Sequence, residues 1–511
     1  MENAKNTEKQ GLLIRWLNWL EKVGNKLPHP LILFFYFTVT VIIATAIVSW
    51  LGVTAVHPST GYEIEVLNLL SGEGIARIFS TFLNNFTGFA PLGQVLVIML
   101  AIGLLDQLGL LSNILKSIIL VVPKRFITPM LIFVSVLSSV ATDAGYVVLI
   151  PLGAALFASM KRHPIAGLAA AFAGVAGGFG ANFVITPGDS LLAGISEAAA
   201  QTLDPYYSFN ILGNWYFMIA SVFLIVIVGT FVTEKVVEPR LGEYKGPEVD
   251  DSEIKKAVSA EEKRAMRGAG WAFLITAAIL SLLVVPSWGP LRAEDGAIIG
   301  SPFFTHLIVV LFFLFLVPGI VYGKMTKQIK TKNDIGHYFT ETFKSMAGFI
   351  VLAFMAGQFV GLFAQTNLGA VIAIAGGNFL QNIGFTGFGL ILAFMILSGF
   401  VNLFIGSASA QWLIFAPIFV PMLMQLGYSP EFVQLAYRVG DSVTNPISPL
   451  LSYLALIITF AQKYDKKAGM GTLIATMMPY TIFLTIFWFA LVALFMVLNI
   501  PIGPGAYIML P

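Results

Sequence analysis

The sequence predicts an all-α polytopic membrane protein with nine transmembrane helices, two re-entrant helical hairpins and an inverted-topology repeat. Three observations lead to this fold class. The 511-residue chain is 57% hydrophobic and only 11% charged, whereas soluble domains carry about 25% charged residues. Its apolar runs are long enough for membrane helices, which need about 20 residues each, and they do not alternate as barrel strands do. Two segments of the chain also share a spacing of glycine, proline and apolar residues.

Eleven apolar runs follow an N-terminal segment that we expect to form an interfacial amphipathic helix. Two of these runs, 127–159 and 384–424, are too long for one untilted helix and contain small and polar residues at their middle. We interpret both as hairpins that return to their own side of the membrane. The other nine are the predicted spans, at 31–51, 94–111, 165–200, 213–232, 269–285, 303–323, 346–365, 432–461 and 471–498.

The distribution of lysine and arginine supports this topology and predicts its orientation. With the N-terminus inside the cell, 26 of the 29 basic residues fall on the cytoplasmic side. Only Arg77 and Arg292 fall outside, and Arg438 lies within a span. Because cytoplasmic loops are enriched in basic residues, we expect a cytoplasmic N-terminus and an external C-terminus.

An internal repeat supports the same topology. A shift of 260 residues superposes Gly88 on Gly348, and a shift of 266 residues superposes Pro164 on Pro430. The charge distribution gives the two copies opposite orientations, an arrangement typical of secondary transporters. We therefore divide the chain into a cytoplasmic N-terminus with the amphipathic helix (1–30), the first span and outer loop (31–67), repeat 1 (68–200), central spans with a charged cytoplasmic linker at 234–267 (201–327), repeat 2 (328–462), and the last span with the C-terminus (463–511).

The residue types present exclude several classes of protein. Without a G-x-x-x-x-G-K-[ST] loop, we do not expect an ATP-driven pump, so the energy must come from an ion gradient or from the gradient of the substrate. Cysteine is absent and the five histidines are scattered, so no disulfide, zinc site or haem site is expected. An intramembrane enzyme would need a paired nucleophile and base or a metal cluster, and a channel would need a continuously lined pore. We therefore expect a secondary transporter, not an enzyme, with no cofactor and with H⁺ or Na⁺ as its coupling ion.

Polar residues at helix breaks mark the expected transport site. The hairpin tips, around Asp143 and at 406–412, should meet centrally, because free backbone groups at membrane depth must be buried or line a cavity. Broken spans follow the hairpins, at 177–190 in repeat 1 and at 440–449 in repeat 2. Half-helix ends at such breaks present carbonyl groups to cations and N–H groups to anionic substrates. The cation-binding candidates are Asp143, Asn182, Thr186, Asp189, Ser407, Asp441 and Asn445.

Ionisable residues within spans are functional candidates by default, because each costs about 2.5 to 3.5 kcal/mol to insert. Arg438 and Asp441 are three residues apart and so share a helix face. They form either a structural ion pair or a site in which Arg438 binds substrate. Trp412, near a hairpin tip, either stacks on an aromatic substrate or anchors the helix at the membrane interface.

These motifs resemble the p-aminobenzoyl-glutamate transporter (AbgT) family of bacterial inner-membrane transporters. The resemblance rests on Thr-Pro-Gly-Asp-Ser at 186–190, on Gln411-Trp412 and on the run from Tyr437 to Pro449, and it covers nearly the whole chain. It implies a homodimer that handles p-aminobenzoyl-glutamate or p-aminobenzoate and, in some members, exports sulfonamide antimetabolites by cation-coupled exchange, which links it to folate metabolism and sulfonamide resistance. The transport residues that it implies are Trp412, Arg438, Asp441, Asp189, Ser409, Pro430 and Pro449.

The sequence thus predicts an ion-gradient-coupled secondary transporter of p-aminobenzoate-type aromatic anions, embedded in the inner-membrane bilayer and without a nucleic-acid partner. The alternative is a sodium-coupled dicarboxylate transporter, which shares the design of two hairpins and an inverted repeat. A second cationic side chain at the site would favour that alternative, and only Arg438 is cationic among the candidates. Import or export, the coupling ion and the role of Arg438 stay open at this stage.

Overall fold

The computed structural model describes residues 30–56, 61–120, 123–141, 145–244, 258–293, 296, 301–451 and 453–510. Helices dominate this part of the chain, and its one small sheet pairs β1 (Thr54–Val56) antiparallel with β2 (Glu63–Glu65). Eight helices of the described residues are long and apolar enough to cross a membrane. The predicted class, an all-α polytopic membrane protein, is confirmed. The predicted amphipathic helix near the N-terminus lies outside the described residues.

Seven of the nine predicted spans correspond to long apolar helices. They are α2 (Pro30–Trp50), α3 with α4 (Gly72–Thr87 and Ala90–Gln107), α10 (Trp215–Val232), α13 (Ala260–Leu282), α15 (Leu307–Met325), α17 (Ala347–Gln365) and α23 (Met470–Leu498). The eighth long helix, α20 (Ala408–Gln425), belongs to the second predicted hairpin. The other two predicted spans are interrupted, as described below. A helix pairs its backbone N–H and C=O groups within itself. This is required in the bilayer core, because lipid tails cannot form hydrogen bonds with those groups.

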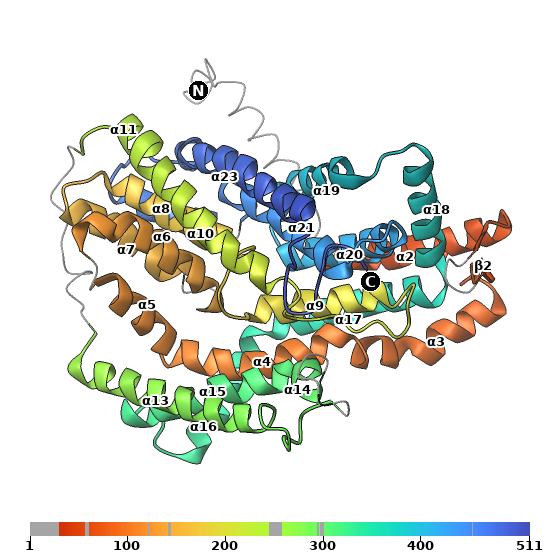
Figure 1. The fold of residues 1–511 in the computed structure, drawn as a ribbon, viewed down its shortest axis with the longest axis horizontal. Helices are drawn as coiled ribbons and strands as arrows, with labels where there is room; N and C mark the ends of the chain where they lie inside the picture. The colour runs from red at the N-terminus through yellow and green to blue at the C-terminus, as the bar shows by residue number, and fades with distance from the viewer. Residues whose placement is uncertain are drawn as a thin grey trace, which may run out of the picture.

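The helices that open the two predicted repeats pack antiparallel (Figure 1). The first pair is α3 with α4, and the second is α16 (Lys332–Ser345) with α17. Helix α3 contacts α17, and α4 contacts α16. Asn85 Nδ2 donates to Gln358 Oε1 at 3.2 Å, and Gln107 Nε2 donates to Thr342 Oγ1 at 2.8 Å. The beginning of each helix pair therefore lies beside the end of the other, which is the geometry that an inverted repeat requires. The boundaries of the repeats remain predictions.

The first long apolar run folds back on itself. It comprises α6 (Ile127–Leu137), the 3₁₀ turn η2 (Ser138–Ala141), the π-helical turn η3 (Gly145–Leu149) and α7 (Ile150–Ser159), and both of its helices pack on α8 (Pro164–Gly177). At the open end, Arg162 Nη1 donates to Thr128 Oγ1 at 2.8 Å. At the other end, Gly145 lies so close to Ser138 that an added Cβ would be 2.2 Å from its hydroxyl. The run therefore returns to the end where it began, as a hairpin does.

The second long run is also a hairpin, formed by α19 (Gly387–Asn402) and α20. Gln411 Nε2 donates to Ser398 O at 2.8 Å, and the Phe394 ring packs on those of Phe415 and Phe419, so the two helices are antiparallel. The tip differs slightly from the prediction. The non-helical residues are 403–407, and the predicted tip residues from Ala408 onward already form the start of α20, because the Ser407 hydroxyl accepts from the Ala410 N–H and caps the helix.

The remaining elements connect these parts. They are α5 (Leu110–Leu120), η1 (Lys124–Phe126), α9 (Pro187–Ala200), η4 (Thr233–Val237), α11 (Glu238–Leu241), α14 (Pro302–Thr305), α18 (Leu368–Asn382), α21 (Pro430–Thr444), η5 (Asn445–Ile447) and α22 (Leu454–Gln462). The larger apolar core surrounds both hairpins, α8 and α21, and a smaller one lies between α4, α13 and α15. The fully buried helices α8 and α21 thus occupy the centre of the larger core.

Candidate functional site

Both predicted broken spans are interrupted in the structure. The first helix, α8, ends at Gly177, and the chain stays non-helical until Thr186 caps α9. The second break begins later than predicted, because α21 continues through Gly440 to Thr444. Pro446 ends the α-helix because proline lacks the N–H that would donate to the Ser442 carbonyl. Asn445 keeps helical dihedral angles and begins the 3₁₀ turn η5. Gly440 instead allows close packing, because an added Cβ would lie 2.3 Å from the Met395 carbonyl oxygen.

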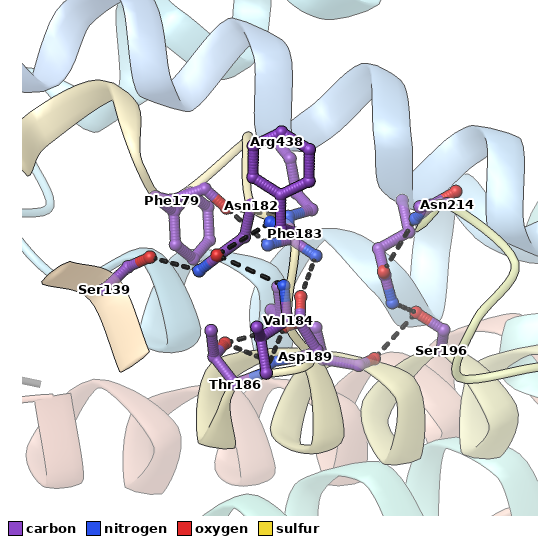
Figure 2. Close-up of polar contacts among 12 residues, drawn as sticks. Ser139, Phe179, Asn182, Phe183, Val184, Thr186, Asp189, Ser196, Asn214 and Arg438 are labelled. Atoms are coloured by element: carbon purple, nitrogen blue, oxygen red, sulfur yellow. Dashed lines mark hydrogen bonds and ion pairs between the residues drawn. The ribbon is translucent and has the colours of Figure 1, made fainter. Parts of the chain in front are cut away.

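Arg438 on α21 connects the two halves of the first broken span (Figure 2). Its Nη1 lies 2.5 Å from Asp189 Oδ1, and its Nε donates to the Phe179 carbonyl at 3.0 Å. Nη2 also donates to that carbonyl. The two charged side chains are only 5% and 3% exposed. Of the two alternatives for Arg438, the ion pair with Asp441 is not the one that the structure forms, because the unwound segment after α8 brings a carboxylate and a carbonyl group to the guanidinium from elsewhere in the chain. The substrate role of Arg438 remains a prediction.

Asp189 stands in the first turn of α9 and has a second set of partners. Its Oδ2 accepts from the Thr186 N–H at 2.6 Å and from the Thr186 hydroxyl at 2.7 Å, while the Asp189 N–H donates back to that hydroxyl at 3.3 Å. This reciprocal capping box satisfies N–H groups at the start of the helix and places a negative charge at its positive end. Both oxygens of Asp189 are thus occupied in this conformation.

Asp441 differs from Asp189, because its carboxylate has no ion pair within the described residues. It is fully buried, and Asn445 Nδ2 donates to Oδ2 at 3.0 Å. The Tyr437 hydroxyl lies 3.5 Å from Oδ1 and 2.5 Å from the Ala408 carbonyl. A hydroxyl has a single proton, and the shorter contact takes it. Asp441 therefore keeps one strong hydrogen bond and no ion pair among the described residues.

Trp412 is completely buried and stacks on Tyr437, with ring centroids 4.5 Å apart and planes inclined by 25°. Its indole Nε1 donates to Ser196 Oγ at 3.0 Å. The same hydroxyl accepts from Gln434 Nε2 at 2.9 Å, and Gln434 Oε1 accepts from Asn214 at 3.0 Å. This polar chain joins α9, α20, α21 and the start of α10. The alternative of an interfacial anchor is excluded, because the Trp412 side chain is completely buried inside the protein.

The end of α21 is held by the second hairpin. Asn402, the last residue of α19, donates through Nδ2 to the Asp441 carbonyl at 3.0 Å, to Thr444 Oγ1 at 2.9 Å and to Asn445 Oδ1 at 2.8 Å. The Asp441 carbonyl also accepts from the Asn445 N–H within the chain, so Asn402 adds a second contact to a carbonyl that the helix already uses. Asn402 therefore fixes the hairpin to the break that follows Asp441.

Both hairpin tips converge on one segment of the second broken span. Tyr146 in the first hairpin stacks on Tyr453, with centroids 4.5 Å apart and planes 8° from parallel. In the second hairpin, Gly406 approaches Leu450 so closely that an added Cβ would be 2.1 Å from its carbonyl oxygen. Both tips thus contact residues 450–453, while their meeting at a central transport site remains a prediction. Asp143 itself lies outside the described residues.

The remaining candidates lie at different distances from this centre. Asn182 Nδ2 donates to Ser139 Oγ at 2.6 Å, which joins the first break to the first hairpin (Figure 2). The Ser407 and Ser409 hydroxyls are 3.3 Å apart at the second tip. Pro430 is the first residue of α21, about two turns before Arg438, and Pro449 is buried beyond η5. The roles of these residues in transport remain predictions.

Sequence reasoning missed several residues of this site. Tyr437, Ser196, Gln434 and Asn402 all contact or position the predicted residues. Ser196 could have been found, because it lies seven residues after Asp189 and hence on the same helix face. The contact of Asn402 with the end of α21 joins distant parts of the chain and leaves no local signal. Among the described residues, no cluster of His, Asp and Glu side chains could hold a metal ion.

Comparison with known proteins agrees with this architecture. The family described as "AbgT putative transporter family" matches residues 15–510. The chain is 38% identical to the p-aminobenzoyl-glutamate transport protein of Escherichia coli (strain K12) over 508 residues, which cover 99% of each chain. These matches identify a transporter and not an enzyme.

Two solved structures share the fold. The Alcanivorax borkumensis YdaH transporter has a TM-score of 0.88 and 42% identity, over 93% of this chain and 100% of that one. Neisseria gonorrhoeae MtrF, described as illuminating a class of antimetabolite efflux pumps, has a TM-score of 0.91 and 43% identity, over 96% of this chain and 100% of that one. On the family match and on these likenesses along nearly its whole length, this multi-pass membrane protein belongs to the AbgT family of transporters.

Proposed function

We propose that this chain is an ion-gradient-coupled secondary transporter of p-aminobenzoyl-glutamate and related aromatic anions such as p-aminobenzoate. The observation that carries the proposal is the buried site at the broken spans, where α21 places an aromatic ring, a guanidinium and a carboxylate without an ion pair close together, and α20 stacks a second aromatic ring on the first. Tyr437 stacks with Trp412, Arg438 supplies the positive charge, and Asp441 is the unpaired carboxylate. The name of the E. coli relative supports the choice of substrate.

The substrate matches these groups chemically. An aminobenzoyl compound has a flat ring, which aromatic side chains bind by stacking, and one or more carboxylates, which Arg438 binds best in a bidentate manner. The buried hydroxyl oxygens of Ser190 and Ser442 have no hydrogen-bond partner among the described residues, and they are next in the sequence to Asp189 and Asp441. A buried polar group without a partner is costly, and a polar ligand would relieve that cost.

In this conformation the site is closed. Trp412 and Asp441 are fully buried, and Arg438 is 4% exposed. A substrate can enter only after the second hairpin or a half-helix moves, which is the behaviour expected of alternating access around a fixed site.

Asp441 is our candidate for the coupling carboxylate. A buried carboxylate without an ion pair carries a desolvation penalty of several kcal/mol, so it must be neutralised by a proton or a bound cation. Asp189 is less suitable for this role, because its two oxygens already hold Arg438 and Thr186. We therefore propose H⁺ or Na⁺ coupling through Asp441, with Asp189 positioning Arg438.

The proposal extends to the cellular setting. We propose a homodimer in the bacterial inner membrane, with a cytoplasmic N-terminus and an external C-terminus, that exports sulfonamide antimetabolites by exchange with the coupling ion. The description of the gonococcal relative supports export.

Because the chain lacks cysteine, single cysteines replacing Lys330 and Tyr206 test the orientation. Impermeant thiol reagents should reach the first only from the cytoplasm and the second only from outside, and labelling of both from one side would refute the topology.

The decisive experiment is transport into proteoliposomes under imposed H⁺ or Na⁺ gradients, with labelled p-aminobenzoyl-glutamate, p-aminobenzoate and succinate. We expect the two aromatic compounds to be transported and Asp441→Asn to lose gradient-driven accumulation while retaining substrate binding.

Trp412→Ala should raise the Kd by roughly 3 to 12-fold from lost stacking alone, and Trp412→Phe should retain much of the affinity. Transport of succinate in preference to the aromatic compounds would refute the proposed substrate class. The comparisons give no support to the dicarboxylate alternative, and the described site holds one cationic side chain, Arg438.

A further inference from the structure

An apolar groove of about 600 Å³ lies on the side of the smaller core, away from the transport site. Helices α4, α5, α13 and α15 form it, and its lining includes Ile114, Phe273, Leu274, Phe315 and Pro318. Several of these side chains are exposed in the isolated chain, including Leu274 at 57%. The predicted spans place this surface in the membrane, so lipid and not water is its natural surrounding.

One cation lies at the edge of this groove. Arg267 on α13 lines it and is exposed, and its side chain makes no hydrogen bond or ion pair with the described residues. The nearest acidic residues along the helix have other partners. Glu262 accepts from the Ser259 N–H at 2.8 Å and from Asn113, and Glu261 lies 3.6 Å from Lys327. The positive charge of Arg267 is therefore available to a ligand.

Arg267 also lies at the depth where a lipid headgroup would be found. It precedes the predicted span at 269–285 by two residues, on the side that we propose is cytoplasmic. Trp271, one turn further along α13, lines the same groove and is 68% exposed. Tryptophan is enriched at the level of the headgroups, and basic residues on the cytoplasmic side attract anionic lipids.

We infer that this groove binds an anionic phospholipid of the cytoplasmic leaflet. The phosphate group contacts Arg267, and an acyl chain lies along Trp271, Leu274 and Phe315. The groove supplies apolar contact along its length and a single cation at its polar end, which matches a lipid with one charged headgroup. The inference depends on the proposed membrane orientation and is independent of the transported substrate.

Native mass spectrometry of the full-length protein in detergent, titrated with phosphatidylglycerol or phosphatidylcholine, tests this site. We expect phosphatidylglycerol to bind more tightly, and Arg267→Gln to weaken its binding roughly fivefold without changing that of phosphatidylcholine. Arg125→Gln is the matched control, because Arg125 is exposed on the same predicted side and lies over the Phe126 ring, outside the groove. It should leave binding unchanged.

A second variant tests the groove itself. An added Cβ at Gly270 would meet no atom within 4 Å, so Gly270→Leu should fold normally while filling the groove and displacing both lipids. Gly348→Leu is the control, because that position is equally open and lies outside the groove. Equal binding of both lipids by all variants would overturn the proposal. A change of oligomeric state in Gly270→Leu, with no change in lipid binding, would also overturn it and assign the groove to a second copy of the chain.

Discussion

A double-mutant cycle on Arg438 and Asp189 tests the central contact of the site. Arg438→Met leaves the Asp189 carboxylate buried without a cation and removes the donors to the Phe179 carbonyl. Breaking a buried ion pair by removing one partner costs about 3 to 5 kcal/mol. Asp189→Asn leaves the guanidinium unpaired and should cost a similar amount. The double mutant no longer buries an isolated charge, so its loss should fall short of the sum by about 1 to 3 kcal/mol.

Equilibrium unfolding in mixtures of detergent and denaturant gives the four free energies of unfolding. A second cycle provides the control, because Asp441 is three residues from Arg438 but is not its ion-pair partner. Arg438→Met combined with Asp441→Asn should be closer to additive. If the cycle with Asp441 showed the larger coupling and the cycle with Asp189 were additive, the local pair suggested by the sequence would be correct and our account of the site would be wrong.

Three further changes test the surrounding structure by thermal unfolding in detergent. Asn402→Ala removes the donor that holds the end of α21 and should destabilise the protein by about 1 to 3 kcal/mol, so an unchanged midpoint would refute this role. Gly440→Ala should destabilise the protein by about 1 to 3 kcal/mol through overpacking, whereas Gly348→Ala, where the added Cβ meets open space, should not. Equal unfolding midpoints for the two variants would contradict the close packing at Gly440. Burial lowers the pKa of His163 below its usual 6.5, so the unfolded chain takes up the proton first and stability should fall as the pH drops below about 6.5. His163→Gln should reduce that loss, and an unchanged pH dependence of the unfolding midpoint in this variant would refute the role of His163.

Much of the fold could be predicted from hydropathy, because lipid imposes long apolar helices and few alternatives. Seven predicted spans and both hairpins correspond to helices close to the predicted residues. The largest difference is at α3 and α4, which begin at Gly72, although the predicted apolar run begins at residue 94. Polar residues in α3, such as Arg77 and Asn85, interrupt the apolar run, while the helix itself continues because it packs against α17.

The site was predicted less completely, because its main contacts join distant segments. Spacing along one helix suggested that Arg438 pairs with Asp441, since residues three apart share a face. The structure joins Arg438 to Asp189 instead, 249 residues away. That contact exists because the chain unwinds after Gly177 and turns Asp189 toward α21, and periodicity in the sequence carries no information about such a turn. The predicted second break starts too early for a related reason. Glycine often ends a helix, but Gly440 lies inside α21 and allows close packing with α19.

The predicted repeat agrees with the antiparallel packing of α3 and α4 against α17 and α16, whereas differences between its two copies account for the charges of the site. The shift of 266 residues places Phe172 at the position equivalent to Arg438, and Val175 at the position equivalent to Asp441. The equivalent helices α8 and α21 are both buried and both precede a break, yet only α21 carries charges at these positions. The alternating access that we propose would use two similar halves, while a site for the proposed anion and coupling ion needs its charges only once. Because Arg438 of one copy is paired with Asp189 of the other, the contact between the copies and the electrostatics of the site depend on the same two side chains.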